Sequence, residues 1–190
     1  MSAFWIALWL DFAAELGDKT QLVALAFATR YNARTVLAGV FVATLMIHLV
    51  SVGLGEAAGW FIPAWAINAL SGLAFIIFGI WTIKGDSIDD EESTLAGKYW
   101  PFMTVAITFF LAELGDKTML ATVTIASQQK SALAVWLGST IGMVLSDGLA
   151  IWVGKVLGKQ LPEQAIKYGA AALFIITGIV TLIGVKWPVS

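Results

Sequence analysis

The sequence predicts an all-α integral membrane protein whose six transmembrane helices form two inverted-topology three-helix repeats. Three observations lead to this prediction. First, 59% of the 190 residues are hydrophobic, only 13% are charged and the mean hydropathy is +0.85, which is typical of membrane proteins. Second, the apolar residues form six long runs. Third, the hexapeptide ELGDKT occurs twice, at residues 15–20 and 113–118.

Each apolar run can form a helix of roughly 20 residues, the length that crosses about 30 Å of hydrocarbon. An open sheet is excluded because its unpaired backbone groups cannot face lipid. The first run lacks the basic segment and the cleavage site of a signal peptide, so we expect it to be a retained span. We place the spans at residues 4–28, 35–59, 65–83, 102–127, 132–155 and 166–186.

The two halves of the chain are related in sequence. The hexapeptides align at an offset of 98 residues (113 minus 15), and one inserted residue then pairs His48 with Asp147. Three spans per half is an odd number, so the second half must enter the membrane from the opposite side. This is the inverted repeat of many secondary transporters. We expect a first repeat at 1–83, an acidic linker at 84–101 and a second repeat at 102–190.

The orientation follows from the Lys and Arg residues in the connections, which favour the cytoplasmic side. With both termini outside and the central linker inside, seven of these residues are cytoplasmic and only Lys130 and Lys186 are outside. The seven are Arg30, Arg34, Lys84, Lys98, Lys155, Lys159 and Lys167. A bacterial cytoplasmic (inner) membrane is the expected location.

The repeated hexapeptide places charged residues inside two apolar runs, where hydrocarbon cannot solvate them. On a continuous helix, Glu15 and Asp18 share a face, as do Glu113 and Asp116. If the first and fourth spans pack together, the four carboxylates converge on one metal site near the membrane midplane. Gly17 lies between the first two acids and allows either close helix contact or an opened turn.

Further polar residues near the motifs are candidates for secondary ligands or a proton relay. Helical spacing directs the Thr side chains away from the acids, which weakens their case. Lys19 and Lys117 are expected to pair with the Glu four residues earlier, although either could also lie at the site. Asp11, one turn before Glu15, is interpreted as a vestibule residue or an interfacial acid. The secondary candidates are Gln21, Thr20, Thr118, Asp147, His48, Lys19 and Lys117.

The ligand chemistry indicates a hard divalent cation. Carboxylate oxygens suit Ca²⁺, Mg²⁺ and Mn²⁺, whereas zinc or copper sites use Cys or several His. The chain has no Cys and one His. Four acids and two Lys leave a charge of about −2, which a divalent ion would neutralise. Because empty buried carboxylates repel one another, protons can replace the metal, and cation/proton antiport follows.

The paired motifs resemble those of the small manganese and calcium exporters defined by two E-x-G-D-[KR]-[ST] sequences. The resemblance covers the whole chain: its length, its two hydrophobic halves, its polar central linker and both motifs. It implies a secondary transporter that exports divalent cations, Mn²⁺ foremost, by proton antiport, with Ca²⁺/H⁺ antiport as the alternative. It also implies that the motif acids Glu15, Asp18, Glu113 and Asp116 bind the metal, with no permanently bound cofactor.

Two other classes of protein compete with a carrier. Paired acids would also suit an intramembrane aspartyl-type enzyme, but each acid pair here adjoins a Lys. A passive channel is the second alternative, although two matched motifs favour alternating access. A net charge of −2 without a basic arm argues against a nucleic-acid partner. The expected partners are therefore a divalent ion, protons and lipid, and a homo-oligomer is left open.

Overall fold

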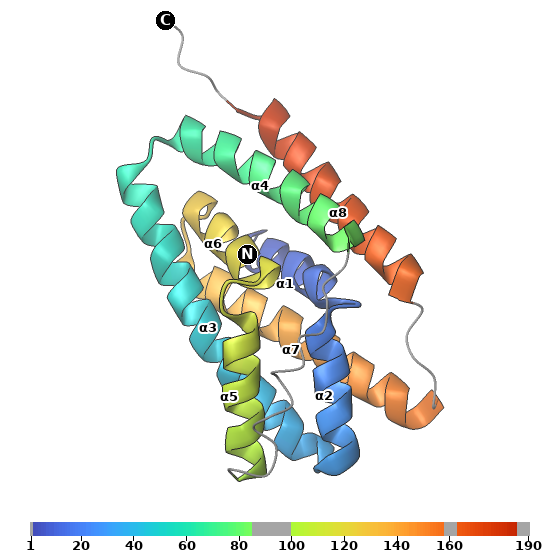
Figure 1. Ribbon diagram of the computed structural model, residues 1–190. Coiled ribbons are helices and arrows are strands. Elements are labelled where there is room, and N and C mark those ends of the chain that lie inside the picture. The colour runs from blue at the N-terminus through green and yellow to red at the C-terminus, as the bar shows by residue number, and fades with distance from the viewer. Residues whose placement is uncertain (1, 85–99, 158–162, 186–190) are drawn as a thin grey trace, which may run out of the picture.

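The computed structural model describes residues 2–84, 100–157 and 163–185, and in that part the chain forms α-helices and no strand (Figure 1). The predicted acidic linker at 84–101 lies outside the described residues except at its two ends. The helices are α1 (Ser2–Glu15), α2 (Lys19–Arg30), α3 (Ala33–Phe61), α4 (Ala64–Lys84), α5 (Pro101–Glu113), α6 (Lys117–Gln128), α7 (Ala132–Leu157) and α8 (Glu163–Ile183).

Two of the six predicted spans are not continuous helices. The span expected at 4–28 is divided into α1 and α2, and the span expected at 102–127 is divided into α5 and α6. Each break contains a glycine in the left-handed region, Gly17 with φ 77° and Gly115 with φ 79°. Glycine adopts this conformation without a steric penalty, and a helix cannot continue through it. The other four predicted spans each correspond to one helix, with ends shifted by three residues or fewer.

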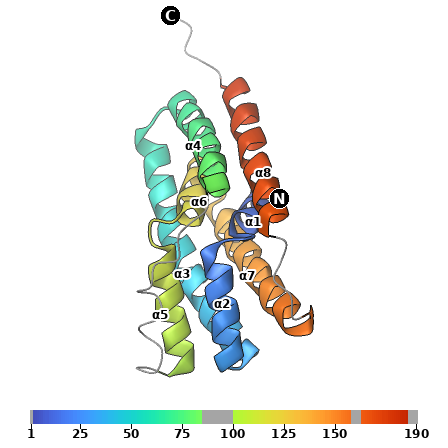
Figure 2. The same cartoon turned by 45° about the vertical axis from the view of Figure 1, so that its right-hand side comes forward.

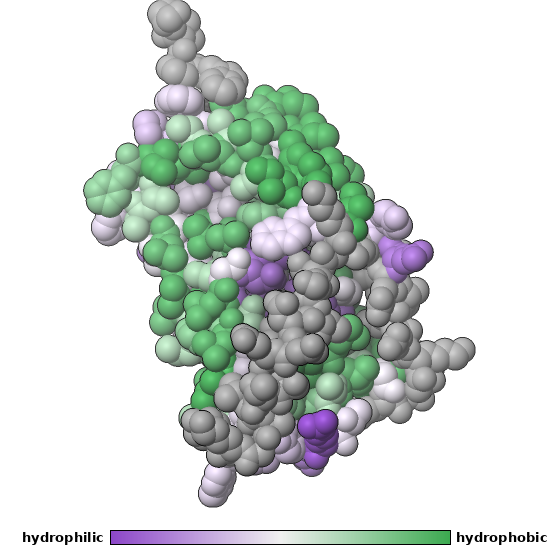
Figure 3. Space-filling model, viewed as in Figure 1, coloured by the Kyte–Doolittle hydropathy of each residue, from purple (hydrophilic) through white to green (hydrophobic). Residues whose placement is uncertain are grey.

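The surface of the described helices suits a lipid environment. By length and composition, α3, α4 and α7 could each cross a membrane, and α5 and the part of α8 at Ala171–Ile183 are shorter apolar helices. Large apolar side chains point outward, among them Leu70, Ile77 and Ile176. Figure 3 shows hydrophobic residues over most of α3, α4 and α8. Such extended apolar surface is rare on soluble monomers, so the chain is that of a membrane protein.

Helices from the two halves of the chain pack against one another. Helix α1 lies along α7, α4 lies along α8, and α3 contacts α5, α6 and α7 (Figures 1 and 2). Glycines allow the closest approaches: a Cβ added at Gly142 would lie 2.4 Å from the Leu8 oxygen of α1, and one added at Gly55 would lie 2.5 Å from the Val123 oxygen of α6. Small residues at helix contacts are the usual packing device in membranes.

We expect Gly142→Ala to destabilise the protein, because the new methyl group must push α1 away from α7. Overpacking of this kind costs about 1–3 kcal/mol. Thermal unfolding in detergent measures the effect. Gly53→Ala is the matched control, because a Cβ there meets nothing within 4 Å and alanine favours the helix. Equal melting temperatures for both variants would contradict the close α1–α7 contact.

Two apolar core clusters lie on either side of the helix breaks. One includes Leu10 of α1 and Ile125 of α6, together with residues of α3, α4, α7 and α8. The other includes Phe27 of α2 and Phe109 of α5, together with residues of α3 and α7. The motif residues at the two breaks therefore lie between two apolar clusters.

Candidate cation-binding site

The helix breaks determine where the motif acids lie. Glu15 is the last residue of α1 and Asp18 is the N-cap of α2, while Glu113 ends α5 and Asp116 is the N-cap of α6. The expectation that each pair shares one helix face is therefore wrong, because Gly17 and Gly115 redirect the chain between the acids. An N-cap Asp normally accepts a hydrogen bond from its own helix. Neither N-cap Asp does so here, which leaves the carboxylates directed elsewhere.

Three of the four motif acids converge. Glu15, Asp18 and Glu113 each place one carboxylate oxygen within 4.8 Å of the others, and all three are at least 97% buried. We call them the carboxylate cluster. Asp116, at 7% exposure, is not part of this group, although its charge is close enough to interact with those of Glu15 and Glu113. The cluster draws on both halves of the chain.

A lysine from the second half compensates an acid of the first. The Nζ atom of Lys117 lies 2.5 Å from Oδ1 of Asp18, and both side chains are buried. Neither carboxylate oxygen of Glu113 has a hydrogen-bond partner within the described residues, and the expected pairing of Lys117 with Glu113 stays a prediction. The side chain of Lys19 lies outside what the structure describes, so its expected pairing with Glu15 stays a prediction.

The hydroxyl groups of the motifs also lie at the cluster. Thr20 donates a hydrogen bond to Oε1 of Glu15, so the expectation that helical spacing turns it away is wrong; the break at Gly17 brings the start of α2 back toward the end of α1. The other oxygen of Glu15 has no partner in the described part of the chain, and the same is true of the buried Thr118 hydroxyl. Neutral oxygens therefore accompany the carboxylates.

Gln21 connects the first break to α7. Its Oε1 accepts a hydrogen bond of 2.8 Å from the Gly17 N–H. Its amide nitrogen lies 2.8 Å from the Ser146 hydroxyl and 3.0 Å from the Ser146 carbonyl oxygen. This holds the break beside Asp147, which is fully buried and whose two oxygens have no partner among described residues. At the matching place in the second half, the Gly115 N–H lies 3.2 Å from the sulfur of Met119.

This arrangement can bind a positive ion. Glu15 Oε2 and both oxygens of Glu113 are buried without a hydrogen-bond partner in the described structure, and uncompensated buried carboxylates are costly. Protons or a cation would remove that cost. With carboxylate and hydroxyl oxygens as its donors, the cluster offers the ligands that hard divalent cations prefer.

Comparison with known proteins identifies the kind of molecule that carries this site. The family model described as "Divalent cation/proton antiporter GDT1" matches residues 3–90 and again residues 101–187. The chain belongs to the GDT1 family. The resemblance inferred from the paired motifs is thereby confirmed. As a GDT1 family member, the chain is a membrane-embedded transporter of divalent cations and protons, and not an enzyme.

Similar GDT1 relatives occur in bacteria and plants. A Vibrio cholerae protein named as a candidate manganese exporter is 33% identical over 95% of this chain and 90% of its own length. GDT1-like protein 5 of Arabidopsis thaliana is 28% identical over 96% of each chain. A GDT1-like protein of Synechocystis is 28% identical over 95% of this chain and 97% of its own. No solved structure matches.

Two further polar residues of this GDT1 chain, His48 and Asp11, are buried in the structure. His48 is buried, with Nδ1 3.3 Å from the Thr140 hydroxyl, and it is not among the residues at ligand spacing. Asp11 is fully buried, so it is not an interfacial acid. Sequence reasoning missed its hydrogen-bond partner, Thr122 of α6, because the two residues are 111 positions apart. The sequence feature that indicated burial of Asp11 was its position inside an apolar run, one helical turn before the motif.

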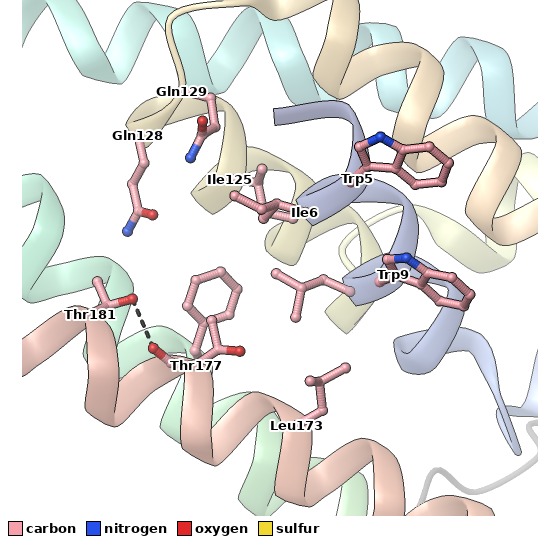
Figure 4. Close-up of a pocket in the computed structure, with 11 residues that line it drawn as sticks. Trp5, Ile6, Trp9, Ile125, Gln128, Gln129, Leu173, Thr177 and Thr181 are labelled. Carbon is pink, nitrogen blue, oxygen red and sulfur yellow. Dashed lines mark hydrogen bonds between the residues drawn. The ribbon is translucent and has the colours of Figure 1, made fainter. Parts of the chain in front are cut away.

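A pocket in the described part of the structure is separate from the carboxylate cluster. It has a volume of about 410 Å³ and lies among α1, α4, α6 and α8 (Figure 4). Apolar side chains dominate its wall, and a hydrogen bond of 2.8 Å from the Thr181 hydroxyl to the Thr177 carbonyl oxygen runs along one side. None of its lining residues is acidic. Its chemistry does not suit a cation.

Proposed function

We propose that this protein exports divalent cations, Mn²⁺ foremost, from the cytoplasm in exchange for protons. The cation binds at Glu15, Asp18 and Glu113, with Asp116 as the fourth acid of the site. The observation that supports this most directly is the group of buried carboxylate oxygens without hydrogen-bond partners in the described structure. Buried carboxylates of this kind are costly unless protons or a metal ion neutralise them. Binding of the metal therefore competes with binding of protons, which couples the movements of the two.

The name of the Vibrio relative favours Mn²⁺ as the ion. A Ca²⁺/H⁺ antiporter is the second candidate, because an all-oxygen cluster suits Ca²⁺ equally well. The charges also fit a divalent ion. With Lys117 paired to Asp18, Glu15, Glu113 and Asp116 leave about three negative charges, of which a divalent ion would neutralise two.

We further propose that the chain forms two inverted three-helix repeats, 1–83 and 102–190, joined by a cytoplasmic linker in a bacterial inner membrane. Helix breaks at matching places in both halves support this, as does a family model that matches the chain twice. Interrupted helices at a repeat interface are a common way to build an ion site in transporters. Both termini are outside in this proposal, in accord with the distribution of Lys and Arg.

In the proposed cycle, protons bind to the carboxylates after the metal has left, and the metal-free carrier takes them into the cytoplasm. Carboxylates this close cannot all stay charged without a cation, so loss of the metal favours protonation. Asp147 is a secondary proton or cation group in this scheme, because its charge interacts with those of Glu15 and Glu113. In this scheme Lys117, which lies 2.5 Å from Asp18, compensates the charge of that acid when no metal is bound.

We expect purified protein in sealed vesicles to move Mn²⁺ in saturable fashion, and more rapidly when a pH gradient drives protons the opposite way. A metal-sensitive dye and a pH-sensitive dye record the two fluxes together. Ca²⁺ and Mg²⁺ are tested at equal concentration. Metal movement without proton movement in either direction would contradict antiport, and Ca²⁺ transport in preference to Mn²⁺ would select the second candidate.

A further inference from the structure

A second polar cluster lies one helical turn from the carboxylate cluster. Asp11 of α1 is fully buried, and its Oδ2 lies 3.2 Å from the Thr122 hydroxyl of α6. The Ser139 hydroxyl of α7 is also buried and lies 3.5 Å from the Thr122 hydroxyl. Three helices from both halves of the chain therefore direct oxygen atoms to one buried point.

The hydrogen bond from Thr122 does not satisfy the Asp11 carboxylate. Its Oδ1 has no partner among the described residues. Thr122 has a single O–H to donate, and the Thr118 carbonyl oxygen at 3.1 Å competes for it. In the described part of the chain, no basic side chain forms an ion pair with Asp11. A buried carboxylate in this state lacks a positive partner.

The fold itself does not require an acid here. At the offset of the internal repeat, Asp11 corresponds to Phe109, Thr122 to Ala24 and Ser139 to Val40. All three counterparts are buried in one apolar core cluster. The same position in the other half is thus filled by hydrocarbon, so the polar cluster is specific to one side of the site.

The location of the cluster links it to the path of the ion. Asp11 precedes Glu15 on α1, and Thr122 follows Thr118 by one turn on α6. Both steps lead away from the carboxylate cluster, one toward the start of α1 and the other toward the end of α6. Thr118, whose buried hydroxyl has no partner within the described residues, lies between Lys117 and Thr122 along α6.

We propose that Asp11, Thr122 and Ser139 form a second oxygen site for the transported divalent cation, next to the carboxylate cluster on the side of the start of α1 and the end of α6. The proposal rests on the proposed function. One carboxylate and two hydroxyls carry less charge than the carboxylate cluster, so this site binds more weakly. A weaker site next to a tighter one allows a cation to leave in steps.

Mn²⁺ binding to the purified protein in lipid nanodiscs, followed by the electron paramagnetic resonance signal of free Mn²⁺, tests this. We expect a tight and a weak class of site in the natural protein. Asp11→Asn should remove the weak class and keep the tight one, whereas Glu113→Gln should weaken the tight class at least tenfold and keep the weak one. Thr122→Val and Ser139→Ala should each weaken only the weak class several-fold.

Matched controls come from buried hydroxyls that bond only their own helix. Ser51 is 2.8 Å from the Ile47 carbonyl oxygen and Thr44 is 2.5 Å from that of Val40. Ser51→Ala and Thr44→Val should leave both classes unchanged. Unchanged weak binding in Asp11→Asn, or in Thr122→Val if the first variant does not fold, would overturn the second site. Tight binding that survives Glu113→Gln would instead refute the carboxylate cluster and the proposed function.

Discussion

Glu113→Gln is expected to reduce Mn²⁺ export by about a hundredfold or more, the largest effect of any single conservative change in the chain. Both carboxylate oxygens of Glu113 are buried and have no hydrogen-bond partner among the described residues. The amide keeps the shape of the side chain but removes one ligand charge and one proton-carrying group. Loss of one buried charge partner costs about 3–5 kcal/mol, which corresponds to a factor of a hundred or more.

Export from cells loaded with Mn²⁺, at equal amounts of protein in the membrane, measures this effect. Glu15→Gln and Asp18→Asn should have similar effects, because the cluster uses acids from both halves. Glu56→Gln is the control, since Glu56 is an exposed acid. Asp116→Asn then decides whether the fourth acid is a ligand: an effect as large as that of Glu113→Gln would place it there. Normal export by Glu113→Gln would refute the single-site proposal.

Lys117→Met is expected to reduce net Mn²⁺ export at least tenfold while Mn²⁺/Mn²⁺ exchange continues. The lysine compensates Asp18 across 2.5 Å in a buried environment, and removal of one partner of a buried ion pair costs about 3–5 kcal/mol. Only the metal-free carrier needs this compensation, because a bound divalent ion supplies positive charge itself. During Mn²⁺/Mn²⁺ exchange the site binds Mn²⁺ on each side of the membrane, so the carrier never changes conformation without a bound metal.

Net export and exchange of radioactive Mn²⁺ are compared in the same vesicles. Lys130→Met is the matched control, because Lys130 is exposed. Equal loss of both activities in Lys117→Met would show that the lysine supports the fold or the bound metal rather than the return of the empty carrier. Unchanged net export would mean that Asp18 needs no compensating charge.

Much of the helical layout was predictable, because apolar runs of the right length allow few alternatives in a membrane. The four unbroken spans agree with α3, α4, α7 and α8 to within three residues. The breaks at Gly17 and Gly115 were harder to predict, because apolar periodicity continues through both motifs. A glycine between two acids was the visible sign, but it is equally compatible with a close helix contact.

The sequence could predict which residue types form the candidate site, but it could predict less of how their side chains are arranged. The repeated motif identified Glu15, Asp18 and Glu113, whereas their partners depend on contacts between helices far apart in the sequence. Local spacing suggested that Lys117 pairs with Glu113, but the structure pairs it with Asp18, 99 residues away. The partners of Asp11 were beyond sequence reasoning for the same reason, as Thr122 is separated from it by 111 residues.

The packing of α1 along α7 has a consequence for biosynthesis. Helix α1 leaves the ribosome first, but its main partner begins at Ala132. Until then, Glu15 and Asp18 are in the membrane without Lys117, and acids at mid-membrane cost about 2.5–3.5 kcal/mol each on insertion scales. We therefore expect the first helices to wait in the insertion machinery or at a hydrated boundary, and the nascent chain to become a folded membrane protein only after its second half has been made.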